Sequence, residues 1–305
     1  MALVDLGVHR CMGGRGSGSK THDHTRAALG HAGSQSFCFS LEGRINRVDQ
    51  HRGYLRVNIG GPLTRLAVVG DVHAHLKRLS VVLDRACAVG VDGVLLVGDL
   101  ACAGRGARTR AQINAYRRQV DAVFDAITSR NMPFCYVPGN HDLEGLSYPG
   151  NVDGRCEDFL GYRVAGIGGT NPPHRGFAYE WTDDDIRNLA LPPCDILISH
   201  CPPLNTPLDF ARGAGRHVGS AAIREQVEGM QGVMVCGHIH ESYGVCQIDA
   251  CLCLNAGGLG RPFGRTQVGF ILDLDTIRHE DLETGQVQIL RRSQPIEHTT
   301  IATIG

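Results

Sequence analysis

From Thr64 onward, hydrophobic positions follow two alternating periods along the chain. Short apolar runs rich in β-branched residues, each bounded by glycine or a turn residue, predict buried strands over 64–70, 92–99, 133–139, 162–169, 194–200 and 232–238. Apolar residues at helical spacing predict helices over 75–90, 110–131, 182–191 and 220–230. The last segments, 243–258, 267–275 and 285–292, predict hairpin-like strands. Strands with crossover helices followed by a β-meander indicate an α/β domain of two packed sheets with helices outside.

The first forty residues have a different pattern. The stretch 13–36, GGRGSGSKTHDHTRAALGHAGSQS, is rich in Gly and Ser and poor in bulky apolar residues. We therefore expect a disordered Gly/Ser/His-rich N-terminal extension over 1–40. Residues 41–63 form a predicted peripheral segment that contains a hairpin over 45–61, and residues 64–305 form the main domain.

Composition excludes several classes of protein. The chain has 305 residues, 42% of them hydrophobic, and a formal net charge of −1, so no overall charge attracts nucleic acid or an anionic membrane. No apolar run reaches the roughly 18–20 residues that span a bilayer, and the N-terminus lacks a continuous apolar signal region. The 12 cysteines lie scattered in apolar runs without a CxxC pair, as expected for buried thiols in the reducing cytoplasm. Cys251 and Cys253 alternate in a strand-like run, which favours core positions over metal ligands.

Polar side chains follow the carboxyl ends of five of these predicted strands. The segments GDVHAH, GD, GNHD, SHCPP and GHIH place there Asp71, His73, Asp99, Asn140, His141, Asp142, His200, His238 and His240. In open α/β sheets ligands bind at this edge, and glycine there leaves room for them. Residues i and i+2 of an extended segment point the same way, so His238 and His240, like Asp71 and His73, are expected to face one cavity.

The residue types predict the chemistry of this edge. Asp, His and Asn ligands without a thiolate suit divalent Mn, Fe or Zn. The ligands outnumber those of one tetrahedral zinc, but they fill two sites if one carboxylate is shared. Two ions ~3.5–4 Å apart can hold the attacking and leaving oxygens of a phosphoryl transfer.

The series GDVH, GD, GNHD, SH and GHIH, spread over Leu66 to Gly258, resembles the calcineurin-like metallophosphoesterase superfamily. Each piece alone is weak evidence, but five in this order, each after a predicted strand, are specific. The resemblance implies a four-layer αββα sandwich of two mixed β-sheets flanked by helices, with a dinuclear metal centre.

The resemblance also implies a role for each matching residue. Asp71, His73 and His240 would hold one metal ion, Asn140, His200 and His238 the other, and Asp99 would bridge them. A metal-bound hydroxide would attack phosphorus, with His141 near the leaving oxygen as general acid or as a donor to the phosphoryl oxygens. The catalytic residues would thus be His141 and Asp99.

The sequence departs from the family pattern at Cys102. Many relatives have GDxxD after the second strand, and the second Asp can pair with the GNH histidine. Without that carboxylate, the imidazolium form of His141 should be less favoured. The absence of the DRG and RGNHE sequences disfavours a Ser/Thr protein phosphatase.

The function predicted from these residues is hydrolysis of a small phosphoester, with phosphodiesters preferred. The stretch from SHCPP to GHIHESYG resembles the phosphodiesterase-like members of the family. The alternatives are a non-catalytic scaffold of the same fold, a phosphomonoesterase, or a nuclease, which the lack of a basic, aromatic-studded stripe disfavours. Asp142 is expected to have a structural role, either capping the following segment or orienting His141. His75 is expected to face solvent or to support the metal ligands. Loop residues that could touch substrate are His174, Arg212, Arg216 and His217. Neither the metal nor the oligomeric state follows from the sequence.

Overall fold

A computed structural model describes residues 64–106, 108–172 and 175–292, together with the backbone of three further strands, β1 (Ile45–His51), β2 (Tyr54–Ile59) and β17 (Glu297–Thr300). The chain divides into two units, Met1–Pro62 and Leu63–Gly305. In the first unit β1 and β2 pair in an antiparallel hairpin, which confirms the predicted hairpin. The expected disorder of residues 1–40 lies outside the described residues.

The second unit contains a seven-stranded sheet in the order β17-β16-β15-β14-β3-β4-β5. β3 (Leu66–Val69), β4 (Gly93–Leu96) and β5 (Phe134–Tyr136) are parallel to one another. β14 (Gln267–Asp273) pairs antiparallel with β3, and β15 (Thr276–Asp281), β16 (Gln286–Arg291) and β17 continue as an antiparallel meander. The meander predicted at the end of the chain therefore extends this sheet.

A six-stranded sheet packs against it in the order β12-β13-β11-β8-β7-β6. Its centre is parallel and consists of β7 (Tyr162–Ile167), β8 (Ile196–Ser199), β11 (Gly232–Cys236) and β13 (Cys251–Asn255). The edge strands β6 (Cys156–Phe159) and β12 (Gly244–Ile248) are antiparallel. The short strands β9 (Phe210–Ala211) and β10 (Arg216–His217) form a separate ribbon.

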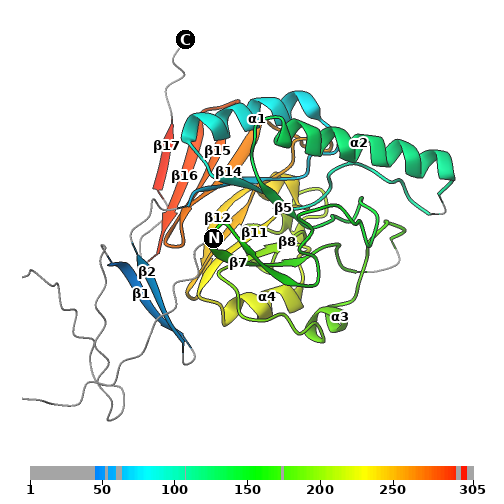
Figure 1. Cartoon of the computed structure of the whole chain (residues 1–305). Coiled ribbons are helices and arrows are strands. Elements are labelled where there is room, and N and C mark those ends of the chain that lie inside the picture. The colour runs from blue at the N-terminus through cyan, green and yellow to red at the C-terminus, as the bar shows by residue number, and fades with distance from the viewer. Residues whose placement is uncertain are drawn as a thin grey trace, which may run out of the picture. The chain divides into compact units, whose positions relative to one another are not determined.

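Helices cover the outer faces of the two sheets (Figure 1). α1 (Leu76–Val89) and α2 (Arg110–Thr128) pack on the seven-stranded sheet, and α3 (Asp183–Arg187) and α4 (Ala221–Glu228) on the six-stranded sheet. The residues of β3 alternate between cores, because successive side chains of a strand point to opposite faces. Ala67 and Val69 pack under the helices, whereas Leu66 and Val68 pack between the sheets. The predicted four-layer αββα sandwich is confirmed.

The helix ends follow local sequence signals. α1 ends at Gly90, whose φ of 72° is the left-handed conformation that glycine adopts without strain. Thr182 caps α3 through a capping box with Asp185. The ring of His75 caps α1 by accepting a hydrogen bond from the backbone N–H of Arg78.

Two features of the fold bear on the composition. The cysteines among the described residues are free thiols, and Cys251 and Cys253 are buried core residues, as expected. None of the helices formed by the described residues has the length and apolar character needed to cross a bilayer.

The hydrophobic pattern of the sequence did not predict strand β15, because most of its residues are polar. Its sequence, TIRHED, has buried His279, Glu280 and Asp281. Glu280 accepts two hydrogen bonds from the guanidinium of Arg85 on α1, at 2.7 and 3.0 Å, and Asp281 is paired with Arg265. Because these partners come from distant parts of the chain, the run looks like an exposed loop in the sequence.

Burial of His279 predicts a loss of stability in acid. The ring stacks on Tyr243, and burial lowers the His279 pKa from 6.5 to about 4. Below pH 6.5 this histidine is protonated in the unfolded chain, whereas in the folded chain it stays neutral down to about pH 4. The free energy of unfolding therefore decreases as the pH falls from 6.5 to about 4. At about pH 5 we expect His279→Phe to stabilise the domain by roughly 2 kcal/mol more than it does at about pH 8. Urea unfolding of both proteins at each pH measures the difference, and an equal effect at both would contradict the prediction.

Candidate metal centre

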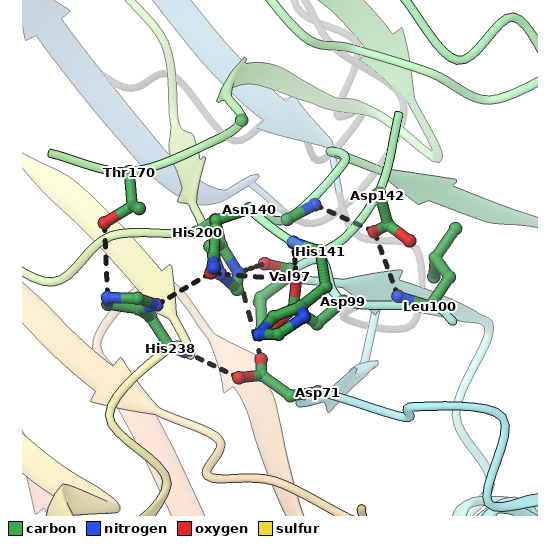
Figure 2. Close-up of polar contacts among 12 residues, drawn as sticks. Asp71, Val97, Asp99, Leu100, Asn140, His141, Asp142, Thr170, His200 and His238 are labelled. Atoms are coloured by element: carbon green, nitrogen blue, oxygen red, sulfur yellow. Dashed lines mark hydrogen bonds and ion pairs between the residues drawn. The ribbon is translucent and has the colours of Figure 1, made fainter. Parts of the chain in front are cut away.

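The polar residues predicted at the strand ends converge at the carboxyl edges of β3, β4, β5, β8 and β11. Figure 2 shows the rings of His200 and His238 close to Asn140, with Asp71 and Asp99 next to them. Several of these side chains are almost fully withdrawn from solvent. Asp71 and His200 are 0% exposed, Asp99 is 2% exposed and Asn140 1%.

The first group consists of Asp71, His73, Asp99 and His240, whose ligand atoms all lie within 4.8 Å of one another. Asp71 Oδ2 lies 2.7 Å from His240 Nε2, and the Nε2 atoms of His73 and His240 are 3.4 Å apart. Asp99 Oδ2 lies 3.5 Å from His73 Nε2. This is a candidate metal-binding cluster of carboxylate and imidazole groups.

The second group consists of Asn140, His200 and His238. Asn140 Oδ1 lies 2.8 Å from His200 Nε2 and 2.9 Å from His238 Nδ1. Asp99 joins the two groups, because its other carboxylate oxygen, Oδ1, lies 3.7 Å from His200 Nε2.

Backbone carbonyls select the tautomers of two of these rings. Nδ1 of His200 lies 2.9 Å from the carbonyl oxygen of Val97, and Nδ1 of His240 lies against the carbonyl oxygen of Pro262. A carbonyl oxygen only accepts hydrogen bonds, so each Nδ1 carries the proton. In the neutral rings the Nε2 lone pairs then point into the site. This is how metal-ligating histidines are usually oriented by their surroundings.

The residues fit divalent cations because acceptors face one another without protons between them. Burial lowers the pKa of His200, so its Nε2 is a bare lone pair that faces the amide oxygen of Asn140. Asp71 Oδ1 is buried and makes no hydrogen bond with the described residues. Burying hydrogen-bond acceptors without donors reduces the stability of the folded chain. Divalent cations bound by His200 Nε2, the Asn140 oxygen and Asp71 Oδ1 would compensate for these missing donors.

The charges of the site lead to the same conclusion. Burial, and then the charge of Asp71, raise the pKa of Asp99 well above its ordinary value. Burial also lowers the pKa of His73 to about 3 and that of His238 well below 6.5. Burial would raise the pKa of Asp71 too, but His240 holds it below its usual range. Two buried carboxylates thus lie among largely neutral rings, an arrangement that divalent ions would stabilise.

The convergence does not arise from the strand alternation expected from the sequence, and that part of the interpretation was wrong. His73, Asp99 and His238 have φ angles of 45°, 48° and 65°, and His240 begins the short 3₁₀ helix η1 (His240–Ser242). Left-handed backbone is strained for these residue types, and such strain gathers at functional sites. Sharp turns after the strands, not extended segments, aim the side chains inward.

Glycines next to the ligands allow this close packing. A Cβ atom added at Gly139 would lie 2.2 Å from Asp99 Oδ1, and one added at Gly237 would lie 2.2 Å from Asp71 Oδ1. Each of these glycines therefore precedes a candidate ligand because no side chain fits there.

His141 lies at the border of the site. Its backbone N–H donates to Asp99 Oδ1 at 2.8 Å, and its ring lies 5.2 Å from that of His73. Cys102 Sγ lies 3.4 Å from His141 Nδ1. The thiol thus occupies the position next to His141 where many relatives have an Asp carboxylate. Burial, and then His200, lower the pKa of His141 to about 4.

Asp142 supports the site from behind. Its buried carboxylate accepts hydrogen bonds from the backbone N–H groups of Leu100, Ala101 and Gly139 and from the Tyr116 hydroxyl (Figure 2 shows part of this network). The carboxylate thus ties together the loops after β4 and β5. This is a structural role, but it is neither the capping nor the His141 contact that the sequence suggested.

The remaining loop candidates are not among the residues of the cluster. His217 Nδ1 lies 2.6 Å from the buried carboxylate of Asp209. The backbone N–H of Arg212 donates to Glu241, the residue after His240, and Arg216 is exposed on β10. His174 lies outside the described residues.

Sequence reasoning missed two sets of contacts. Thr170 Oγ1 lies 3.2 Å from His238 Nε2 and orients that ring. Phe177 packs edge-on against His141 with centroids 4.8 Å apart, and the guanidinium of Arg105 lies over Phe177 at 4.2 Å. A lone Thr, Phe or Arg in a loop has no spacing signal, so only the tertiary structure reveals these contacts.

Comparisons with known proteins agree with the fold. The family model of the calcineurin-like phosphoesterases matches residues 64–242, and the chain therefore belongs to that family. An uncharacterized protein of Methanocaldococcus jannaschii is 28% identical over 178 residues, which cover 54% of this chain and 76% of that protein.

Solved structures also resemble the chain. One crystal structure superposes with a TM-score of 0.55 at 15% identity and covers 79% of this chain and 100% of its own. A dimetal phosphatase from Danio rerio has a TM-score of 0.48 at 11% identity, with 79% and 99% coverage. The phosphoesterase Yfce from E. coli has a TM-score of 0.39 at 17% identity, with 78% and 100% coverage.

Proposed function

We propose that this protein is a metal-dependent phosphoester hydrolase that prefers phosphodiesters and uses two divalent ions, such as Mn, Fe or Zn. Asp71, His73 and His240 would hold one ion, a second group would hold the other, and Asp99 would be shared. The second group is Asn140, His200 and His238. The observation that carries the proposal is the position of Asp99, whose Oδ2 lies 3.5 Å from His73 and whose Oδ1 lies 3.7 Å from His200.

The ions would supply Lewis-acid chemistry, lowering the pKa of water and offsetting phosphoryl charge. The side chains would position the reaction. His238 is held between Thr170 and Asn140, and His200 by the Val97 carbonyl, so neither ring must reorient when substrate arrives. His141, at the open border, would donate a hydrogen bond to a substrate oxygen.

The preference for diesters follows from charge. A phosphomonoester carries up to two negative charges near neutral pH, since the second pKa of a phosphate is about 6, and a diester carries one. With a pKa of about 4, His141 is a neutral hydrogen-bond donor near neutral pH. It therefore adds no positive charge to balance the second negative charge of a phosphomonoester. A diester therefore suits the site better.

The test is turnover of bis-p-nitrophenyl phosphate beside p-nitrophenyl phosphate in Mn²⁺. We expect the diester to have the larger kcat/KM. Faster monoester turnover would overturn the preference for diesters. No turnover of either ester, across Mn²⁺, Fe²⁺, Co²⁺ and Zn²⁺ and with metal shown to be bound, would favour a non-catalytic scaffold of the same fold.

Cys102 offers a separate test of the role of His141. Cys102→Asp places a carboxylate where Sγ now lies 3.4 Å from His141 Nδ1. We expect the His141 pKa to rise from about 4 by roughly 1–3 units, because a nearby negative charge favours imidazolium. An NMR titration of the His141 ring measures the shift, with Cys102→Ser as the uncharged control. Equal pKa values in the two variants would show that Cys102 does not set the protonation of His141.

A further inference from the structure

A cavity of about 440 Å³ is lined in part by Glu241, the residue that follows His240 of the candidate metal centre. Its lining includes Arg212, Glu241, Tyr243, Phe263, Arg265 and Glu283. None of these residues belongs to the metal-ligand set, so the cavity is distinct from the groups described above.

Two of the lining residues are chain neighbours of His240 or of a residue that contacts it. Glu241 follows His240 in the chain, and Phe263 follows Pro262, whose carbonyl oxygen lies against His240 Nδ1. This adjacency is the basis for placing one ester group of a substrate in the cavity while its phosphorus lies at the centre.

Phe263 is the unusual residue of the cavity. Its side chain is 58% exposed, and its backbone has a φ of 56°. A bulky residue in left-handed backbone is strained, and an exposed aromatic ring contributes little to the core. Because the backbone of Phe263 is strained and its ring is not buried, the ring does not serve the stability of the core. This indicates a role in binding.

The surroundings of the ring suggest what it could bind. Glu241 uses one carboxylate oxygen to accept the Arg212 N–H at 3.1 Å, and a carboxylate has further acceptor capacity. Tyr243, whose ring stacks on His279, lines the same cavity and can donate or accept. The lining of the cavity thus includes aromatic side chains and hydrogen-bonding groups, and its volume lies within the range of small-molecule sites.

We propose that this cavity binds a flat aromatic group with hydrogen-bond donors and acceptors at its edge, as in a nucleobase, and so selects nucleoside phosphodiesters. Phe263 would stack on the base, and Glu241 would accept from the edge of the base. The inference rests on the proposed phosphodiesterase function and names its substrate class.

The experiment compares two diesters with the same leaving group, thymidine 5′-(p-nitrophenyl phosphate) and methyl p-nitrophenyl phosphate. We expect kcat/KM of the wild type to be at least about tenfold higher for the thymidine ester, and Phe263→Gly to lower the ratio of the two values by about tenfold. Glycine relieves the strained φ, so this variant removes the ring without unfolding the loop. Phe263→Tyr should keep the ratio, and so should Val81→Ala, which truncates a side chain on α1 that is 51% exposed.

Calorimetric titration of the thymidine ester into metal-free protein gives a readout that does not depend on turnover. We expect the Kd of Phe263→Gly to be at least about fivefold weaker than that of the wild type. Turnover of both esters with a ratio near one, or a ratio that Phe263→Gly leaves unchanged, would overturn the inference while the proposed function stands. If the thymidine ester binds in a way that depends on Phe263 but neither ester is turned over, the inference stands and the proposed function is overturned. Failure of the thymidine ester to bind would overturn the inference on its own.

Discussion

Asp99→Asn is expected to lower kcat for bis-p-nitrophenyl phosphate by at least about 10²-fold. The amide keeps the shape of the carboxylate and an oxygen that can accept the His141 N–H, which Oδ1 now binds at 2.8 Å. It lacks the negative charge, and it cannot present an anionic oxygen to both His73 and His200. Steady-state kinetics measures the loss, and elemental analysis of the purified variant should show less bound metal than in the wild type.

The matched control is Asp158→Asn, the same change at an exposed carboxylate on β6. We expect it to leave both kcat and metal content unchanged. An Asp99→Asn protein that keeps wild-type turnover and metal content would contradict the role of Asp99 as the shared ligand.

Loading with Mn²⁺ is expected to produce the largest change in stability. Metal-stripped protein buries Asp71 and Asp99 among acceptors that face one another, so a cation that binds only the folded chain stabilises it by mass action. At about 100 times the Kd, one site contributes about 2.7 kcal/mol, which raises Tm by roughly 5–10 °C in a domain of this size. Thermal denaturation with and without Mn²⁺, after treatment with EDTA, measures the shift.

Two variants test whether the shift arises at this centre. Asn140→Ala removes the amide oxygen between His200 and His238 and should reduce the Mn²⁺-dependent increase in Tm. His217→Gln changes a histidine that binds Asp209 and is not among the residues of the cluster, so it should preserve the increase. Equal shifts in both variants would place the metal elsewhere on the chain.

Periodicity predicted most elements of the second unit. The apolar runs of β3, β4, β8 and β11 are short and bounded by turn residues, and α1 and α2 have clear apolar stripes, so local sequence defines them. β15 was missed, because its buried charges are recognisable only with their distant partners in place. Ile113 and Leu76 extend the apolar stripes in sequence but are not among the buried residues of their helices.

The candidate ligands could be predicted because a strand end is a local feature. Each follows an apolar run, and parallel strands bring such ends to one edge whatever the lengths of the loops. The reason for their convergence could not be predicted. The left-handed backbone of His73, Asp99 and His238 arises from the turns after the strands and from packing against Gly139 and Gly237.

By itself, the sequence determined two packed sheets with helices outside through its periodicity. The order of its short motifs indicated the family, and the resemblance implied the four-layer sandwich and the residues of the candidate centre. Only the tertiary structure decided which atoms face one another. It placed Asp99 between the two groups, Cys102 beside His141, Asp142 among four donors and Phe263 at the edge of a cavity. The physical reason is that tautomers, burial and strained turns depend on neighbours far away in the chain, which no local pattern records.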